Sequence, residues 1–149
     1  MTAEGWVAGV LFLHVVSTLV MVGVIWMVQV VHYPLMAFAD RNRYPAFQRA
    51  HERRIGWVVI PPMLIELVTA AALAMASWSP VPPALAWIGL ALLAVIWAST
   101  FSLQVPRHRR LQRGFDQVAH ERLVRSNWVR TVGWTARGIL VLVMLRFLP

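Results

Sequence analysis

The sequence contains no cysteine and no lysine, and only 6 of its 149 residues are acidic. Without cysteine the chain has no disulfide, thiolate metal site or thiol nucleophile, so histidine, carboxylates, methionine and amides remain as ligand groups. All 14 basic residues are arginines, which gives a formal net charge of +8. Hydrophobic residues make up 59% of the chain and mean hydropathy is +0.63. This composition excludes a water-soluble globular domain and predicts an integral membrane protein.

Four apolar stretches are each long enough to cross a bilayer as a helix, which takes about 20 residues. The first is interpreted as a span and not as a signal peptide, because Glu4 precedes it and no arginine does. The prolines of residues 79–83 predict a short turn between the second and third spans. We therefore expect an all-α four-helix bundle, a single transmembrane domain over residues 1–149, with spans at about 5–32, 55–78, 84–105 and 127–147.

The arginines predict how this bundle is oriented. Twelve of the 14 lie in two connections, between Asp40 and Arg54 and between Pro106 and Arg130. By the positive-inside rule both connections are cytoplasmic and both termini lie outside, in a multi-pass protein of the bacterial inner membrane. Apolar residues alternate with charge over 112–125, so we expect interfacial helices that lie on anionic lipid head groups. This placement of the arginines predicts membrane lipids as partners and argues against nucleic acid.

Polar side chains at membrane depth recur every three or four residues, so each set forms one stripe on its helix. Such groups are costly in hydrocarbon and are expected to face the bundle interior. Glycines at positions 23, 89 and 138 are expected to allow close helix approach. From these stripes we select His14, Gln29, Gln104 and Asn127 as candidate cofactor-binding residues. The stripes are His14, Thr18, Met21, Ile25, Gln29 and His32; Thr100, Gln104 and His108; and Asn127, Arg130 or Thr131, Trp134 and Arg137.

Three ionisable groups from three different helices are predicted to share one layer near the middle of the membrane. At about 1.5 Å per residue, His14, Glu66 and Arg137 all lie roughly 12–18 Å from the outer helix ends. One interpretation is a structural Glu66–Arg137 pair with His14 as a hydrogen-bonded neighbour. The other makes His14 an axial ligand of a haem or metal, or makes His14 and Glu66 a proton relay beside a quinone-like substrate. On that interpretation the catalytic candidates are Glu66, Arg137 and Arg130, the arginines holding an anionic group.

A second layer is expected at the arginine-rich boundary, where four of the five histidines lie. His32, His51, His108 and His120 each adjoin the end of a predicted span. Asp116 and His120 are spaced i, i+4, which on a helix allows both to contact one ion. Such a set suits iron, copper, zinc or manganese, so the four histidines are the metal-ligand candidates. The alternative is that interfacial loops collect histidine for lipid head groups and that the four do not meet.

Several segments resemble those of a group of small bacterial four-helix membrane proteins to which no activity is assigned. The segments are residues 26–35 (WMVQVVHYPL), 51–54 (HERR), 61–66 (PPMLIE), 104–108 (QVPRH), 114–116 (GFD) and 127–131 (NWVRT). More remotely, an early histidine in the first helix followed by an interfacial histidine is similar to the haem-binding protoporphyrinogen oxidases of the HemJ type. Those enzymes carry a lysine on a later helix, which this chain lacks. The last two helices also resemble anthrone-oxygenase-like membrane proteins.

Two functional hypotheses follow from these residues. In the first, the protein is a membrane oxidoreductase with a haem or a transition metal, iron or copper, that acts on a lipophilic small molecule. In the second it is not an enzyme but a small transporter or an assembly subunit, in which Glu66, Arg137 and His14 line a proton path or only lock the bundle. A transporter of this length is expected to form a homodimer, because four short helices enclose little volume.

Overall fold

The computed structural model describes residues 3–147, which form four long helical rods joined by three short connections. In two of the rods a π-helical segment joins two α-helices: η1 joins α1 to α2, and η3 joins α4 to α5. The rods are α1 (Ala3–Met27) with η1 (Val28–His32), α2 (Tyr33–Leu35) and η2 (Met36–Phe38); α3 (Tyr44–Met75); α4 (Pro83–Ser99) with η3 (Thr100–Gln104) and α5 (Val105–Leu111); and α6 (Gln117–Met144) with η4 (Leu145–Phe147).

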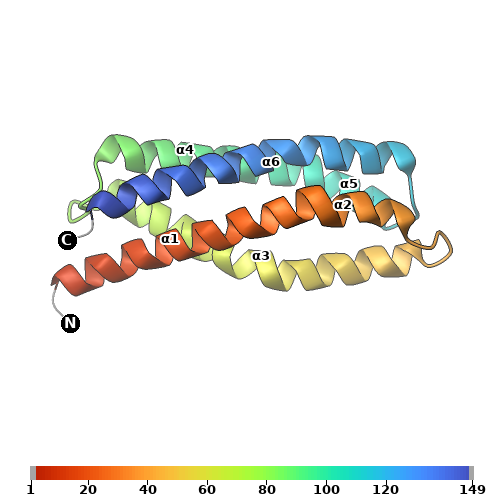
Figure 1. The fold of residues 1–149 in the computed structure, drawn as a ribbon, viewed down its shortest axis with the longest axis horizontal. Coiled ribbons are helices and arrows are strands. Elements are labelled where there is room, and N and C mark those ends of the chain that lie inside the picture. The colour runs from red at the N-terminus through yellow and green to blue at the C-terminus, as the bar shows by residue number, and fades with distance from the viewer. Residues whose placement is uncertain (1–2, 148–149) are drawn as a thin grey trace.

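All four rods are long and apolar enough to span a membrane. They run side by side, and the arginine-rich connections η2–α3 and α5–α6 lie at one end of the bundle (Figure 1). The start of α1, the α3–α4 connection and η4 lie at the opposite end (Figure 1). Among the described residues, the prediction of an all-α bundle of four membrane-length helices is therefore confirmed.

The rods extend further at the arginine-rich end than the sequence predicted. α3 begins at Tyr44, where the expected span began at residue 55, and α6 begins at Gln117, where it began at 127. The structure thus differs from the expected separate helices, because most of these arginines lie on continuations of the four long rods. The physical reason is local: Pro45 starts α3 at a position that tolerates proline, and Asp116 caps α6 by accepting a hydrogen bond from Ala119 N at 2.7 Å.

Both π-helical segments end two residues before a proline, Pro34 or Pro106. Proline has no N–H and its ring clashes with the carbonyl four residues earlier, which would break a regular α-helix. Here the N–H of the residue before each proline donates to the carbonyl five residues earlier, one residue further back than in an α-helix. Tyr33 N donates to Val28 O, and Val105 N donates to Thr100 O. This wider turn lets each rod continue past its proline and rotates the residues that follow.

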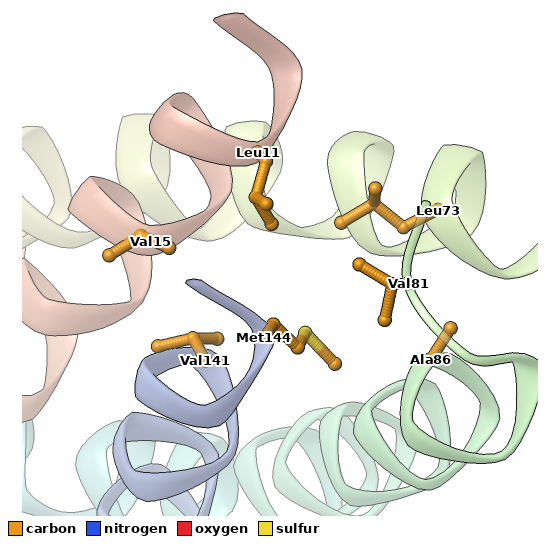
Figure 2. Packing of buried hydrophobic residues seen from close by; sticks show 7 residues of the cluster. All are labelled: Leu11, Val15, Leu73, Val81, Ala86, Val141 and Met144. Carbon is orange, nitrogen blue, oxygen red and sulfur yellow. The ribbon is translucent and has the colours of Figure 1, made fainter. Parts of the chain in front are cut away.

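The core between the rods consists of three apolar clusters along the bundle. Figure 2 shows the cluster at the end where α1 begins, in which Leu11, Leu73, Val81 and Met144 converge from α1, α3, the α3–α4 connection and α6. The middle cluster surrounds Trp134, and the third lies at the arginine-rich end. The outer faces carry large exposed apolar side chains, as a lipid-facing surface does, among them Phe12, Val68, Val132 and Ile139.

Close helix approach occurs at two of the three expected glycines. A Cβ at Gly138 would lie 3.0 Å from Val22 Cγ2, and one at Gly89 would lie 3.2 Å from Leu140 Cδ2. Gly23 has no such neighbour within 4 Å, so the prediction for that position is wrong.

Candidate functional site

The polar stripe of the first rod faces the bundle interior from His14 to Gln29, as its spacing predicted, whereas His32 at its end is partly exposed. His14, Thr18 and Gln29 are buried together with the apolar residues Met21 and Ile25 between them. The stripe of α6 is also buried, and it ends at Arg137, whose side chain is fully inaccessible. Each stripe therefore brings its buried polar groups against the other rods.

The central layer is a closed polar network around Glu66 and Arg137. Arg137 Nε donates to Glu66 Oε1 at 2.5 Å, and Thr18 Oγ1 donates to the same carboxylate oxygen at 2.7 Å. Arg137 Nη1 donates to the backbone carbonyl of Gly89 on α4. The predicted contact between the charges of α3 and α6 is confirmed.

His14 lies beside this pair, and both of its ring nitrogens have partners. Nδ1 is 2.9 Å from Thr69 Oγ1, and Nε2 is 3.4 Å from Arg137 Nη2. The expected contact of His14 with the ion pair is therefore confirmed. In this arrangement His14 supports the network.

A layer of amides lies closer to the arginine-rich end. Asn127 Nδ2 donates to Gln29 Oε1 at 2.9 Å, and Gln29 Nε2 donates to the Val124 carbonyl at 3.2 Å. Arg130 Nη1 donates to Asn127 Oδ1 at 3.2 Å. Gln104, the remaining candidate amide, instead contacts Ser99 at 3.3 Å and Ser126 at 3.4 Å. The four candidate cofactor-binding residues are thus divided among separate networks.

A pair of histidines lies between the first rod and α3. His32 Nε2 lies 2.8 Å from His51 Nδ1, and the two rings stack with centroids 4.4 Å apart. The ring of His108, from α5, lies beyond, with its centroid 5.7 Å from that of His51. Three of the four predicted histidines therefore meet in space, although they come from three different rods.

Tyr33 and Gln48 hold His108 in place. The Tyr33 hydroxyl is 3.0 Å from His108 Nε2, and Gln48 Nε2 donates to His108 Nδ1 at 2.8 Å. Gln48 also donates to Glu52 Oε1 at 2.8 Å, and Tyr33 interacts with Arg130. Sequence reasoning missed both Tyr33 and Gln48. The only signal was position, because Tyr33 follows His32 directly and Gln48 lies three residues before His51 on the same helix.

His120 and Asp116 do not join the histidine pair. His120 Nε2 lies 2.7 Å from the backbone carbonyl of Tyr33, the first residue of the short helix α2. Asp116 precedes α6 and caps it, so it does not lie on one helix with His120, as the i, i+4 spacing had assumed. The hydrogen bond from Ala119 N, together with Arg110 alongside at 2.6 Å, holds the pKa of Asp116 below its usual value.

A surface groove opens at the histidine pair. It has a volume of about 330 Å³, and its walls are mainly apolar side chains of the first rod and α3. A second depression of about 520 Å³ adjoins it, sharing His32 and Phe47. We refer to the first as the histidine groove; it is lined by Met27, His32, Phe47, Ala50, His51, Arg54, Ile55 and Val58.

The described residues do not contain a complete metal site made of protein ligands alone. Over residues 3–147, no three histidine, cysteine, aspartate or glutamate side chains are arranged to hold one ion. The four-histidine set that the sequence suggested is therefore reduced to the His32–His51 pair with His108 close by.

Comparisons of the chain with protein-family models, curated proteins and solved structures give no match. Function must accordingly be argued from the geometry of the polar clusters and of the groove.

Proposed function

We propose that the chain is a membrane-embedded oxidoreductase that binds iron or copper at His32 and His51 and acts on a lipophilic substrate in the histidine groove. One observation carries the proposal: two imidazole nitrogens lie 2.8 Å apart at an apolar surface groove. The groove volume lies within the range of small-molecule sites, about 300–1,000 Å³.

The two histidines fit a transition metal better than they fit a haem. Nitrogen donors at about 2.0–2.1 Å from one ion are about 3 Å apart, close to the observed spacing of His32 Nε2 and His51 Nδ1. Imidazole suits both iron and copper, and an ion of either kind supplies redox chemistry when bound. His14, the candidate haem ligand, has both nitrogens in hydrogen bonds.

The residues around the pair can position a substrate and move a proton. Apolar Met27, Ile55 and Val58 line the part of the groove that would receive a lipophilic body. Arg54 at its rim offers a cation to a polar or anionic head. With Gln48 donating to Nδ1 of His108, the Nε2–H of His108 points to the Tyr33 hydroxyl, which gives a path for a proton on the inner side of the cluster.

The three candidate catalytic residues differ in whether they can take part in the proposed reaction. Arg130 lies beside Tyr33 and close to the histidine cluster, so it can stabilise negative charge there. Glu66 and Arg137 are occupied by each other, by Thr18 and by Gly89, so they serve the bundle and not the reaction.

We infer that the arginine-rich end faces the cytoplasm of a bacterial cell, with both termini on the outer side. The support is that both connections flanked by the 12 arginines lie at one end of the bundle. The histidine groove then lies at the cytoplasmic boundary of the inner membrane, where an amphiphilic substrate can enter from the lipid.

The test is the metal content and absorption spectrum of the detergent-purified protein, air-oxidised and then reduced with dithionite. We expect about one iron or copper per chain, and we expect His32→Gln and His51→Gln each to lose it. His120→Gln is the matched control, because the structure places His120 on the Tyr33 carbonyl and not on the pair. A folded, colourless and metal-free protein would refute the proposal.

A second candidate function has its own observation. Glu66, Arg137, Thr18 and His14 are buried almost completely and bonded to one another, as groups that only lock a bundle would be. This favours a non-enzymatic transporter or assembly subunit, acting as a homodimer, if the metal is absent. Glu66 Oε2 has no hydrogen-bond partner among the described residues, so it is the atom at which a proton path would begin.

A further inference from the structure

A separate, polar depression lies between η3–α5 and α6. It shares no lining residue with the histidine groove. Its volume is about 240 Å³, and three arginines line it: Arg107, Arg110 and Arg122. We propose that this depression binds the phosphate head group of one anionic phospholipid. The proposal is independent of the metal and of the oxidoreductase function.

The charge around the depression is not balanced by the protein. Arg110 pairs with Asp116, its Nη2 lying 2.6 Å from Oδ2. Within residues 3–147 no carboxylate lies at ion-pair distance from Arg107 or Arg122. Like charges held around one small depression repel one another unless an anion lies between them. Two uncompensated guanidinium groups therefore favour a bound anion.

The local geometry presents the guanidinium groups to a phosphate. Arg107 Nη1 donates to the Leu103 carbonyl at 2.5 Å, which folds this side chain back along its own helix toward the depression. Arg122 reaches the same space from α6. A planar guanidinium group can bind two phosphate oxygens at once. Basic sites between transmembrane helices typically bind anionic lipid head groups.

The surroundings favour a lipid over a free phosphate ion. The depression is also lined by Leu103 and by the exposed Val118, so its wall changes from charged to apolar. Phe101 is exposed on the same π-helical segment as Leu103. A phospholipid has both the phosphate that the arginines bind and the acyl chain that such an apolar surface contacts.

The test measures the affinity of the delipidated, detergent-purified protein for phosphatidylglycerol, by native mass spectrometry or thermal shift. Each arginine near a lipid head group is worth about fivefold in affinity, so Arg107→Gln/Arg122→Gln should bind about 30-fold more weakly. The matched control is Arg49→Gln/Arg109→Gln, which removes the same charge from exposed positions outside the depression. This control should stay within about threefold of the wild type.

A third variant, Ser102→Glu, keeps every arginine and places a negative charge on the wall of the depression. This variant should also weaken phosphatidylglycerol binding. It tests the proposal independently if the double variant fails to fold. Equal losses in the double variant and its control would overturn the proposal, since binding would then follow net charge alone. Stabilisation by inorganic phosphate as strong as by phosphatidylglycerol would overturn the choice of a lipid.

Discussion

Arg137 of α6 donates a 2.5 Å hydrogen bond to Glu66 of α3, and around this one pair all four rods of the bundle meet. Thr18 of α1 donates to the same carboxylate oxygen, and the Gly89 carbonyl of α4 accepts from Arg137. Both charged side chains are almost completely buried in the bundle. A buried pair of this kind fixes the register of α3 against α6, because a shift of either would leave a buried charge unpaired.

Removing one partner of this pair should therefore be much more harmful than removing both. We expect Arg137→Met to destabilise the detergent-solubilised protein by about 3–5 kcal/mol, because it leaves a buried carboxylate alone. The double variant Glu66→Leu/Arg137→Met should lose clearly less stability than Arg137→Met alone. Thermal unfolding followed by circular dichroism measures this, with Arg146→Gln, an exposed arginine near the end of the same rod, as the control. Small, additive effects would contradict a locking role.

The central layer could be predicted from the sequence because its physics is simple. Each polar residue at membrane depth must find a partner, and helix geometry fixes its depth to within a turn. His14, Glu66 and Arg137 therefore had to share a layer, and they do. The Gly89 carbonyl was not predictable, since a backbone acceptor within a helix becomes available only through local packing that no sequence pattern records.

The arginine-rich end was harder to predict for two reasons. An amphipathic stretch on the membrane surface and an amphipathic extension of a spanning helix have the same sequence pattern, so the starts of α3 and α6 were placed too late. The partners of the histidines depend on the sharp connections and on the rotation that the π-helical segments introduce. His120 therefore contacts the Tyr33 carbonyl, an acceptor whose position no spacing rule gives.

His108 should contribute to metal binding although it lies beyond the histidine pair. Its ring packs 5.7 Å from that of His51 and is held by Tyr33 and Gln48. We expect His108→Ala to lower the affinity for iron or copper about 10–100-fold, because its ring packs against the ring of the proposed ligand His51 and its loss would free that ring to move. Competitive titration with a metal chelator measures this. Unchanged affinity in a folded His108→Ala variant would limit the site to the His32–His51 pair.

Filling the histidine groove should block the substrate without removing the metal. Ala50 of α3 lines the groove, and a tryptophan there would occupy much of its roughly 330 Å³. We expect Ala50→Trp to abolish binding of a fluorescent quinone analogue while metal content stays at the wild-type level. Val132→Trp, on an exposed face of α6, is the control for added bulk. Retained quinone binding in Ala50→Trp would mean that the substrate enters elsewhere.

Asp116 should make the start of α6 sensitive to acid. Its pKa is lowered from an ordinary value of 3.8, first by the hydrogen bond from Ala119 N and then by Arg110. A lowered folded-state pKa means that the ionised side chain stabilises the fold at pH values above about 4, and that this contribution is lost as the pH falls below that value. Asp116→Asn should therefore have a lower melting temperature at pH 7, and the difference should shrink by pH 3. A difference that does not change with pH would contradict this assignment.

Gly133 should tolerate substitution least among the glycines of the spanning helices. A Cβ at this position of α6 would lie 2.8 Å from Ile96 Cγ1, and Ile96 is itself fully buried on α4. We expect Gly133→Ala to destabilise the bundle by about 1–3 kcal/mol, since overpacking outweighs the better helix propensity of alanine. Ile96→Val should restore part of the loss by removing a methyl group at the contact. Gly23→Ala, with open space around it, should instead be neutral or stabilising by up to about 1 kcal/mol. Equal melting temperatures for the two alanine variants would mean that α4 and α6 approach each other less closely than this contact requires.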